Sequence, residues 1–425
     1  MSLRAKKCLK IAGVACAVAV LILIVILLWQ FLSGYGGLEM HVEKGNRWTC
    51  SVTIGACDDI HVRIPRYMNG RKVTAIGVFN GSKIKSIKIP GSVTSISGGT
   101  FQFCSSLTDV NIPKGVTIIN SRTFDGCTSL ERIALPDGIT KIERGAFSDC
   151  IALKDIALPS KTAEIGELAF YNCVSLKSLT LPDSMESLGI RAFSDCTGLT
   201  EIDLGSGLST VGDSAFMGCT SLTEIVIPEN VTDLGSMAFY GCTGLESVTY
   251  NVGDNVLVVR DSIFSNCTSL TDVTLGNKLP NIGASMFAGC SSLSEIIIPE
   301  AVYEIGSYAF QSCTSLRSIV IPNNVWSLGE GAFFGCSSLS EITVSESISD
   351  IKRDTFSGCS SLESIVIPHS VQSIGENAFN GCSSLTEIRY SGTTDEWSAI
   401  DIAENWLGDV SVTVYCSNGN IEYNR

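Results

Sequence analysis

Cysteine is the residue type whose number and spacing first suggest chemistry in this chain of 425 residues. Thirteen of its 18 cysteines recur at a 23-residue interval, apart from one 25-residue step, and each has Phe three positions before it and Leu three positions after it. Zinc is bound by four ligands that converge on one point, often in pairs two to four residues apart. Because these cysteines lack that spacing, they indicate a repeated structural unit. They are Cys104, Cys127, Cys150, Cys173, Cys196, Cys219, Cys242, Cys267, Cys290, Cys313, Cys336, Cys359 and Cys382.

The repeated unit reads L-x-x-I-x-I/L-P-x-x-V-x-x-I/L-G-x-x-A-F-x-x-C, as in residues 222–244. Its L-x-x-I-x-I part predicts a short strand that ends at Pro228, because proline has no N–H to donate to a sheet. The next apolar pair, Val231 and Leu234, is predicted to point inward, and Gly235 permits a tight bend. The segment A-F-x-x-C is too short for a regular helix, which favours a single helical turn.

A period of this length predicts a repeat solenoid, in which each unit buries its apolar side chains against its copies. We expect about fourteen 23-residue coils over residues 73–390, with a parallel β-sheet on one face and short turns or 3-10 segments on the other. A strand spacing of about 4.8 Å gives a rod on the order of 65 Å long. The first coil is degenerate, since it keeps Phe79 but has Ser82 in place of cysteine. The two extra residues of the 25-residue step are expected in a bulge after Tyr250 that leaves the stack unbroken.

The thirteen matched copies resemble the leucine-rich repeats of the BspA-like family, also called the Treponema-pallidum-type repeat. The resemblance covers roughly residues 58–390, which is most of the chain. It implies a horseshoe or gently twisted solenoid on a microbial surface. It also implies adhesion or partner binding, with no enzymatic activity in this domain.

The N-terminus has the features of a membrane segment. Residues 11–32 carry no charge, and as a helix they would extend about 33 Å, enough to cross a bilayer. Four cations precede them, and no acidic residue occurs before Glu39. The positive-inside rule therefore predicts a single-pass protein of the cell membrane, with a cytoplasmic tail at residues 1–10, a signal anchor at 11–32 and an extracellular repeat domain. The alternative is a cleaved signal, with Gly34 and Gly36 at the cleavage site and a secreted product.

The segments on either side of the repeats are predicted to cover the open ends of the stack. Residues 33–72 are interpreted as a linker and an N-terminal cap, because the first coil would otherwise expose its apolar face. Residues 391–425 are interpreted as a C-terminal cap, with Trp397 and Trp406 over the last coil and V-S-V-T-V-Y-C as a final strand.

The thirteen repeated cysteines are predicted to be unbridged. Coils in register hold equivalent Cβ atoms near the strand spacing and pointing the same way, whereas a disulfide needs Cβ atoms about 3.8 Å apart on converging bonds. We interpret these thiols as small buried hydrophobes that donate weak S–H hydrogen bonds to neighbouring backbone carbonyls. Cys50 and Cys57, in the N-terminal cap, are the better candidates for a disulfide, and the sequence leaves that pairing open.

Acidic residues dominate the chain and recur at one strand position. Without the four N-terminal cations, 25 Lys and Arg stand against 43 Asp and Glu, a balance that argues against nucleic-acid binding. The outward position before the central Ile holds Asp109, Asp155, Glu201, Glu224, Asp272, Glu295, Glu341 and Glu387. The next outward position holds Thr180, Val226, Thr249, Thr274, Ile297, Val320, Thr343 and Val366. No loop motif of the kind that supplies six to eight oxygen ligands to Ca²⁺ is present.

Two interpretations of these outward columns stay open. Acids keep a sheet soluble, and β-branched residues suit an extended backbone. Alternatively, the columns bind a ligand, with apolar residues supplying contact area and acids selecting a basic protein partner, such as a host, neighbouring-cell or matrix protein. The candidate partner-binding face comprises Asp155, Glu201, Glu224, Val226, Asp272, Glu295, Ile297, Val320, Glu341, Val366 and Glu387.

The sequence does not point to an enzyme. Its three histidines, His41, His61 and His369, belong to different coils or to the cap, and no phosphate-binding loop or nucleophile motif is present. We therefore predict no catalytic, cofactor-binding or metal-binding residue. The predicted function is that of a membrane-anchored surface protein that mediates protein interaction or adhesion through its strand face. The alternative is a structural spacer of the cell envelope without a specific ligand.

Overall fold

The computed structural model describes residues 37–42, 49–54, 60–251 and 258–424. The predicted cytoplasmic tail and signal anchor, residues 1–32, lie outside these ranges, as does Cys57. Within the described ranges, no helix has both the length and the apolar character needed to cross a bilayer.

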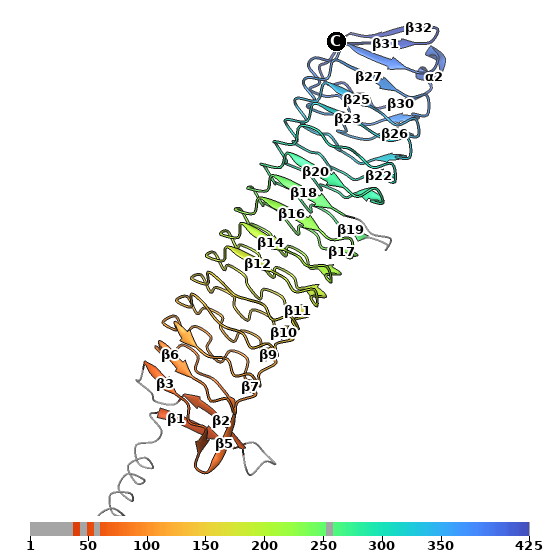
Figure 1. Ribbon diagram of the computed structural model, residues 1–425. Coiled ribbons are helices and arrows are strands. Elements are labelled where there is room, and N and C mark those ends of the chain that lie inside the picture. Colours follow the sequence, from red (N-terminus) through yellow and green to blue (C-terminus); the bar gives the residue numbers. More distant parts are fainter. Residues whose placement is uncertain (1–36, 43–48, 55–59, 252–257, 425) are drawn as a thin grey trace, which may run out of the picture.

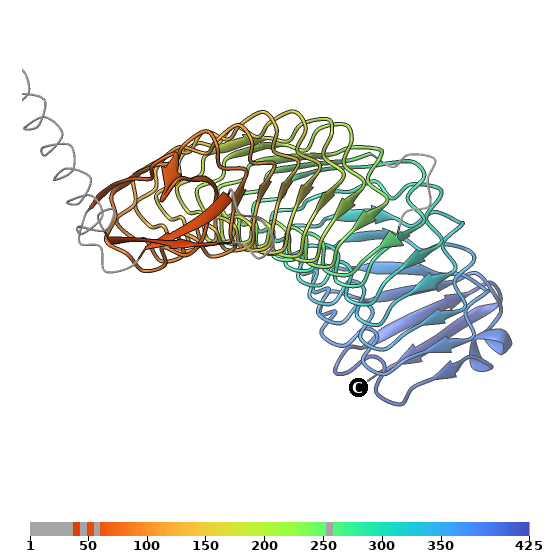
Figure 2. The ribbon, with the colours of Figure 1, turned by 90° about the horizontal axis from the view of Figure 1, so that it is seen from below.

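The described chain forms a β-solenoid of about 15 turns that stack into a curved rod (Figures 1 and 2). Most turns contribute a strand to a first row, at the L-x-x-I-x-I segment, and a strand to a second row, at the V-x-x-I segment. The first row comprises β3 (His61–Arg63), β6 (Ser86–Lys88), β8 (Asp109–Val110), β12 (Ser178–Thr180), β14 (Glu201–Asp203), β16 (Glu224–Ile227), β18 (Ser247–Tyr250), β20 (Asp272–Leu275), β23 (Ser318–Val320), β25 (Glu341–Thr343), β27 (Ser364–Ile367), β29 (Glu387–Tyr390) and β31 (Val412–Cys416). The second row comprises β2 (Thr49–Ile54), β5 (Arg71–Ile76), β7 (Ser95–Ile96), β9 (Ile118–Ile119), β10 (Lys141–Ile142), β11 (Glu164–Ile165), β13 (Ser187–Leu188), β15 (Thr210–Val211), β17 (Asp233–Leu234), β19 (Val258–Val259), β21 (Asn281–Ile282), β22 (Glu304–Ile305), β24 (Ser327–Leu328), β26 (Asp350–Ile351), β28 (Ser373–Ile374) and β30 (Asp401–Ile402).

The first row confirms the predicted parallel sheet. Within β16, Ile225 and Ile227 are buried, whereas Glu224 and Val226 are exposed, as expected for a strand with one face on the core. Strand β16 pairs in parallel with β18, and β18 with β20, so equivalent residues of successive coils lie side by side. The row is divided into several shorter sheets along the rod.

The second row of strands was not predicted from the sequence, which indicated only that the apolar residues of this segment point inward. In the coil that contains Val231 and Leu234, both side chains are buried, and Asp233 and Leu234 pair in parallel with the next coil. A strand of two residues leaves no alternation in the sequence from which it can be recognised. Gly235 follows this strand, and a Cβ there would lie only 2.4 Å from the nitrogen of Asp213, so close approach between coils requires glycine at this position.

The third side of each coil is the F-x-x-C turn. The nitrogen of Cys127 donates to the carbonyl oxygen of Phe124 at 3.0 Å, which closes a short turn, and the nitrogen of Phe124 donates to the oxygen of Ala146 in the next coil at 2.8 Å. The residue before the cysteine has positive φ in most coils, as at Gly126 (71°) and Asn172 (57°). Glycine, asparagine and aspartate tolerate this conformation best, which explains why they predominate at this position.

Aromatic rings form a continuous column inside the rod. Fourteen phenylalanines, from Phe79 to Phe379, lie face to face or tilted with successive ring centroids 5.1–5.8 Å apart. Trp406 ends the column with its ring edge-on to Phe379 at 5.8 Å. Each coil thus buries its aromatic ring only because its neighbours cover both faces of that ring.

The 25-residue step leaves the stack intact. Across this step, Tyr250 pairs with Leu275 in the first row, and Leu234 pairs with Val259 in the second. The two extra residues therefore fall between Tyr250 and Val258, as predicted. Beyond the step, strand pairing in the two rows ends at β19 and β20, whereas the aromatic column continues from Phe264 to Phe287.

Antiparallel strands occur at both ends of the rod. Strand β1 (Leu38–His41) pairs antiparallel with β2, and β4 (Tyr67–Met68) with β5. At the C-terminal end, helix α2 (Thr394–Ser398) begins with a capping box between Thr393 and Glu396. Strand β31 extends the first row, and β32 (Gly419–Tyr423) pairs antiparallel with it, which covers the edge that β31 would otherwise expose.

Candidate partner-binding surface

The outward positions of the first row hold the candidate side chains at the surface. Ten of the eleven candidate residues are exposed. The exception is Glu387, which is half-buried and forms an ion pair with Arg389 at 3.2 Å. The face is therefore oriented as expected, although the residues are spread over more than ten coils.

Four of the candidate residues gather around one depression. Asp272 on β20, Val320 on β23, and Glu295 and Ile297 on the coil between them line a shallow hollow of about 720 Å³. Ile297 is 85% exposed and Val320 is 65% exposed, the two highest values among the large apolar side chains of the described chain. We call this hollow the 272–320 depression.

A break in the first row creates this depression. Strand β20 pairs with β18, and β23 pairs with β25, but residues 293–299 between them form no strand. The inward residues next to the break, Val273 and Leu275, are half-buried, whereas the equivalent residues of β16 are buried. The opening therefore makes apolar side chains of two layers accessible at one place.

Negative charge surrounds the apolar centre. The lining includes the carboxylates of Asp272, Glu295 and Glu300 and, among the described residues, no lysine or arginine. None of the three carboxylates forms an ion pair with another described residue. Exposed apolar groups rimmed by unpaired acids suit a partner with an apolar side chain beside basic ones.

Two aromatic residues on the same coils were missed by the sequence interpretation. Tyr303 and Trp326 follow the buried Val302 and Val325, at the start of the second-row segment. Ile297 and Val320 belong to the first-row segments of the same coils. Their rings are parallel with centroids 6.5 Å apart, and they are 44% and 57% exposed. At this repeat position most coils carry Thr, Ser or another small residue, so alignment of the repeats could have singled them out.

The remaining candidate residues do not converge on one site. Asp155 lines a smaller hollow of about 370 Å³ with Thr180, at another gap in the first row. Glu201, Glu224 and Val226 lie on β14 and β16, whereas Glu341, Val366 and Glu387 lie on β25, β27 and β29. The predicted face thus contains one concentrated apolar site and several scattered acidic positions.

The repeated cysteines are buried thiols with suppressed reactivity. All thirteen are buried and unbridged, and each donates its S–H to the carbonyl oxygen of the phenylalanine in the preceding coil, as Cys219 does to Phe193 at 3.2 Å. This confirms the predicted packing role. Burial raises the pKa of Cys242, Cys290 and Cys336 to about 12, which suppresses the reactive thiolate. The pairing of Cys50 with Cys57, which the sequence leaves open, is not tested because Cys57 lies outside the described residues.

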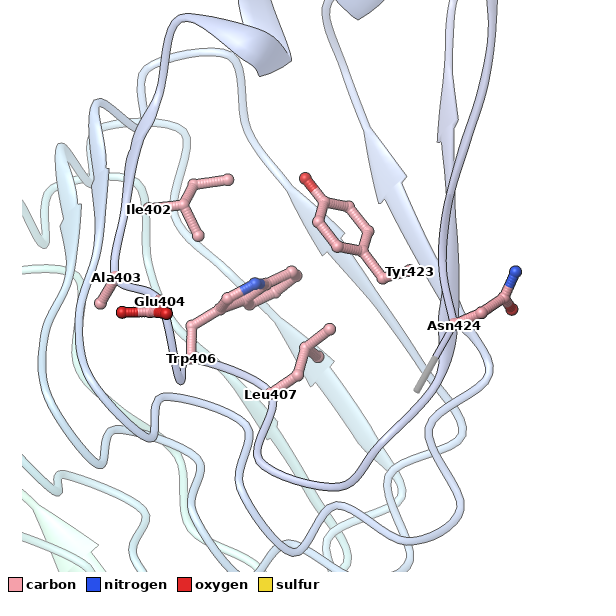
Figure 3. A pocket seen from close by; sticks show the side chains of 7 residues that line it. All are labelled: Ile402, Ala403, Glu404, Trp406, Leu407, Tyr423 and Asn424. Atoms are coloured by element: carbon pink, nitrogen blue, oxygen red, sulfur yellow. The ribbon is translucent and has the colours of Figure 1, made fainter.

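A further hollow, of about 340 Å³, lies in the C-terminal end of the rod. Figure 3 shows Trp406 and Leu407 on one side of it and Tyr423 on the other. The ring of Tyr423 is edge-on to Trp406 at 5.3 Å, and its hydroxyl accepts a hydrogen bond from Trp397 Nε1 at 3.0 Å. These aromatic contacts serve to close the core. Among the described residues, no cluster of three or more His, Cys, Asp or Glu side chains can hold a metal ion.

Parallel strands in 23-residue coils, stacked around columns of Leu, Ile, Phe and Cys, define a leucine-rich repeat solenoid, a class that is typically a non-enzymatic scaffold for binding proteins. The family model described as "BspA type Leucine rich repeat region (6 copies)" matches residues 74–200, 186–317 and 304–401, and the chain belongs to this family.

A solved structure agrees with this assignment. It is a leucine-rich repeat protein from Bacteroides ovatus that is 32% identical, with a TM-score of 0.67 over 89% of this chain and 98% of that one. A leucine-rich cell surface protein from Faecalibacterium prausnitzii is 27% identical, with a TM-score of 0.48 over 86% of this chain and 96% of that one. No curated protein matches the chain.

Proposed function

We propose that this chain is a membrane-anchored cell-surface protein that binds a protein partner through the 272–320 depression. The observation that carries the proposal is the exposure of Ile297 and Val320 together, over a break in the sheet and inside a rim of unpaired carboxylates. Contiguous exposed apolar groups are uncommon on soluble surfaces and frequently mark interaction sites. The proposed partner presents an apolar side chain flanked by lysine or arginine.

The location is part of the same proposal. The uncharged segment at residues 11–32, preceded by four cations, supports an N-terminal anchor with the solenoid outside the cell. Host, neighbouring-cell and matrix proteins are then the accessible partners. Many copies on one surface would strengthen attachment through multivalent contact, even when each contact is weak.

The test measures attachment of beads that carry the full chain to a surface coated with reconstituted basement-membrane matrix. We expect attachment to weaken about tenfold in the variant Ile297→Ser/Val320→Ser, since both side chains lose their apolar contact area. The matched control is Val226→Ser/Val366→Ser, which changes two exposed valines outside the depression in the same way. The control is expected to attach as the parent chain does.

The spacer alternative predicts a different result. If beads do not attach, or if both double variants attach as well as the parent, the 272–320 depression is not a binding site for this class of protein. Equal loss in both variants would instead assign binding to the whole strand face. Higher salt should weaken attachment if the rim carboxylates select basic partners.

A further inference from the structure

Charge is segregated along the rod in a way that the overall acidity conceals. Residues 60–108 contain seven lysines and arginines and no acidic residue. Residues 192–259 contain nine aspartates and glutamates and no lysine or arginine. Between them, residues 109–191 are nearly neutral, with nine cations and 11 acids.

The basic stretch presents its cations on the outer face of the first row. Arg63, Lys85 and Lys88 are exposed, and the register of β3 and β6 places Arg63 directly opposite Lys88. Like charges directly opposite each other on a sheet are destabilising. One ion pair, from Lys88 to Asp109 at 3.5 Å, compensates this repulsion only in part because both side chains are more than half exposed. We call Arg63, Lys85 and Lys88 the basic surface.

The acidic stretch presents its carboxylates on the same face. Glu201, Asp203, Glu224 and Glu246 are all exposed on β14, on β16 and just before β18. None of the four forms an ion pair with another described residue. Glu201 and Glu224 occupy equivalent positions one coil apart, as Arg63 and Lys88 do, so the spacing of charges matches on the two surfaces. We call these four residues the acidic surface.

The two surfaces cannot neutralise each other within one molecule. They are about six coils apart, or roughly 30 Å at the usual strand spacing. At physiological ionic strength, interactions between exposed charges are screened beyond about 8 Å. Apart from the ion pair between Lys88 and Asp109, neither surface forms an ion pair within the described part of its own chain.

We infer that the partner of the basic surface is the acidic surface of a second copy of this chain. In an antiparallel pair related by a two-fold axis, the basic surface of each copy faces the acidic surface of the other. The axis then passes near residues 109–191. There the almost neutral stretch of one copy faces the same stretch of the other copy without strong repulsion. This contact uses coils outside the 272–320 depression. It is therefore a second interaction, and its test does not depend on whether the depression binds a partner.

The experiment is a charge exchange on the full chain in detergent micelles, with association measured by sedimentation velocity at low and high salt. We expect the parent chain to form dimers that added salt dissociates. Arg63→Glu/Lys85→Glu should associate at least about tenfold more weakly. Folding should be retained, because the new carboxylate at position 63 faces Lys88. Glu201→Lys/Glu224→Lys should show the same loss.

A mixture of the two variants is the decisive sample. Each variant alone presents like charges to its copy, whereas together they present opposite charges in both contacts, so mixed dimers should form about as well as parent dimers. The control Glu341→Lys/Glu363→Lys makes the same change in net charge as Glu201→Lys/Glu224→Lys, on two exposed residues outside the paired stretches 60–259. It should associate like the parent.

Two results overturn the inference. The first is a parent chain that stays monomeric at all salt concentrations, and the second is a mixture that fails to associate. In the first case, the monomeric parent chain is also tested for binding of inorganic polyphosphate, with loss of that binding in Arg63→Glu/Lys85→Glu. That last result would assign the basic surface to an anionic polymer.

Discussion

Residue type is nearly constant from coil to coil in the interior of the rod, whereas it varies on the outer face of the same coils. Inside, the aromatic position is phenylalanine in every coil from Phe79 to Phe379, and the rings keep a nearly constant spacing. Outside, one column of the first row changes from Arg63 through Asp203 to Ile297. An inward side chain must fit against its copies above and below, so one shape is repeated. An outward side chain contacts mainly solvent, so charge and polarity vary from coil to coil. The comparison locates stability in the interior columns and specificity on the outer face.

The largest expected effect is alkaline unfolding of the solenoid. Burial raises the pKa of the interior thiols, to about 12 at Cys242, Cys290, Cys336 and Cys382, from about 8.5 in an unfolded chain. Since the folded state holds the thiols neutral, their contribution to stability is complete below about pH 8.5 and is lost as the pH rises toward 12.

Each such thiol should remove about 1.4 kcal/mol of stability per pH unit in that window, so the rod is expected to unfold at alkaline pH. Circular dichroism during a base titration measures the midpoint. Replacement of Cys242 and Cys290 by alanine should make the transition less steep in pH. A transition equally steep in that variant would mean that other groups cause the unfolding.

A large effect is also expected when one ring is removed from the aromatic column. Phe216 is fully buried between Phe193 and Phe239, with ring centroids 5.4 and 5.1 Å away. Phe216→Ala opens a cavity and should lower the free energy of unfolding by about 3–5 kcal/mol. Urea-induced unfolding followed by circular dichroism measures the change. A loss below about 1 kcal/mol would contradict the assignment of stability to this column.

An intermediate effect is expected at one interior cysteine. Cys219 is buried and donates its S–H to the oxygen of Phe193 at 3.2 Å. Cys219→Ala removes this weak hydrogen bond and one buried atom, which should cost about 1–2 kcal/mol of unfolding free energy. The same urea titration applies. Cys416, which is only half-buried, is the matched control, and Cys416→Ala should cost less.

The smallest effect is expected on the outer face of the same region. Glu224 is exposed and has no ion pair among the described residues. Glu224→Ala should change the free energy of unfolding by no more than about 0.5 kcal/mol. Its melting curve, compared with that of Phe216→Ala, tests the contrast directly. Similar melting of the two variants would show that the inward and outward positions have been assigned wrongly.

The sequence by itself determined the architecture and the orientation of each repeat position. Because an isolated coil cannot bury Leu222, Phe216 and Cys219, their recurrence in every coil allows only a stack in which they face inward. The same register places Glu224 and Val226 outward. The spacing also excluded disulfides within the row, since in-register cysteines point the same way.

Only the tertiary structure decided where the outer face becomes a site. The break at residues 293–299 has no signature in the sequence, since this coil carries the same L-x-x-I-x-I motif as its neighbours. Whether strands pair there depends on the spacing between whole coils. The stacking of Tyr303 on Trp326 likewise requires two successive coils to bring equivalent positions into contact. A repeat pattern specifies which way each side chain points, whereas the spacing between coils decides which exposed side chains meet.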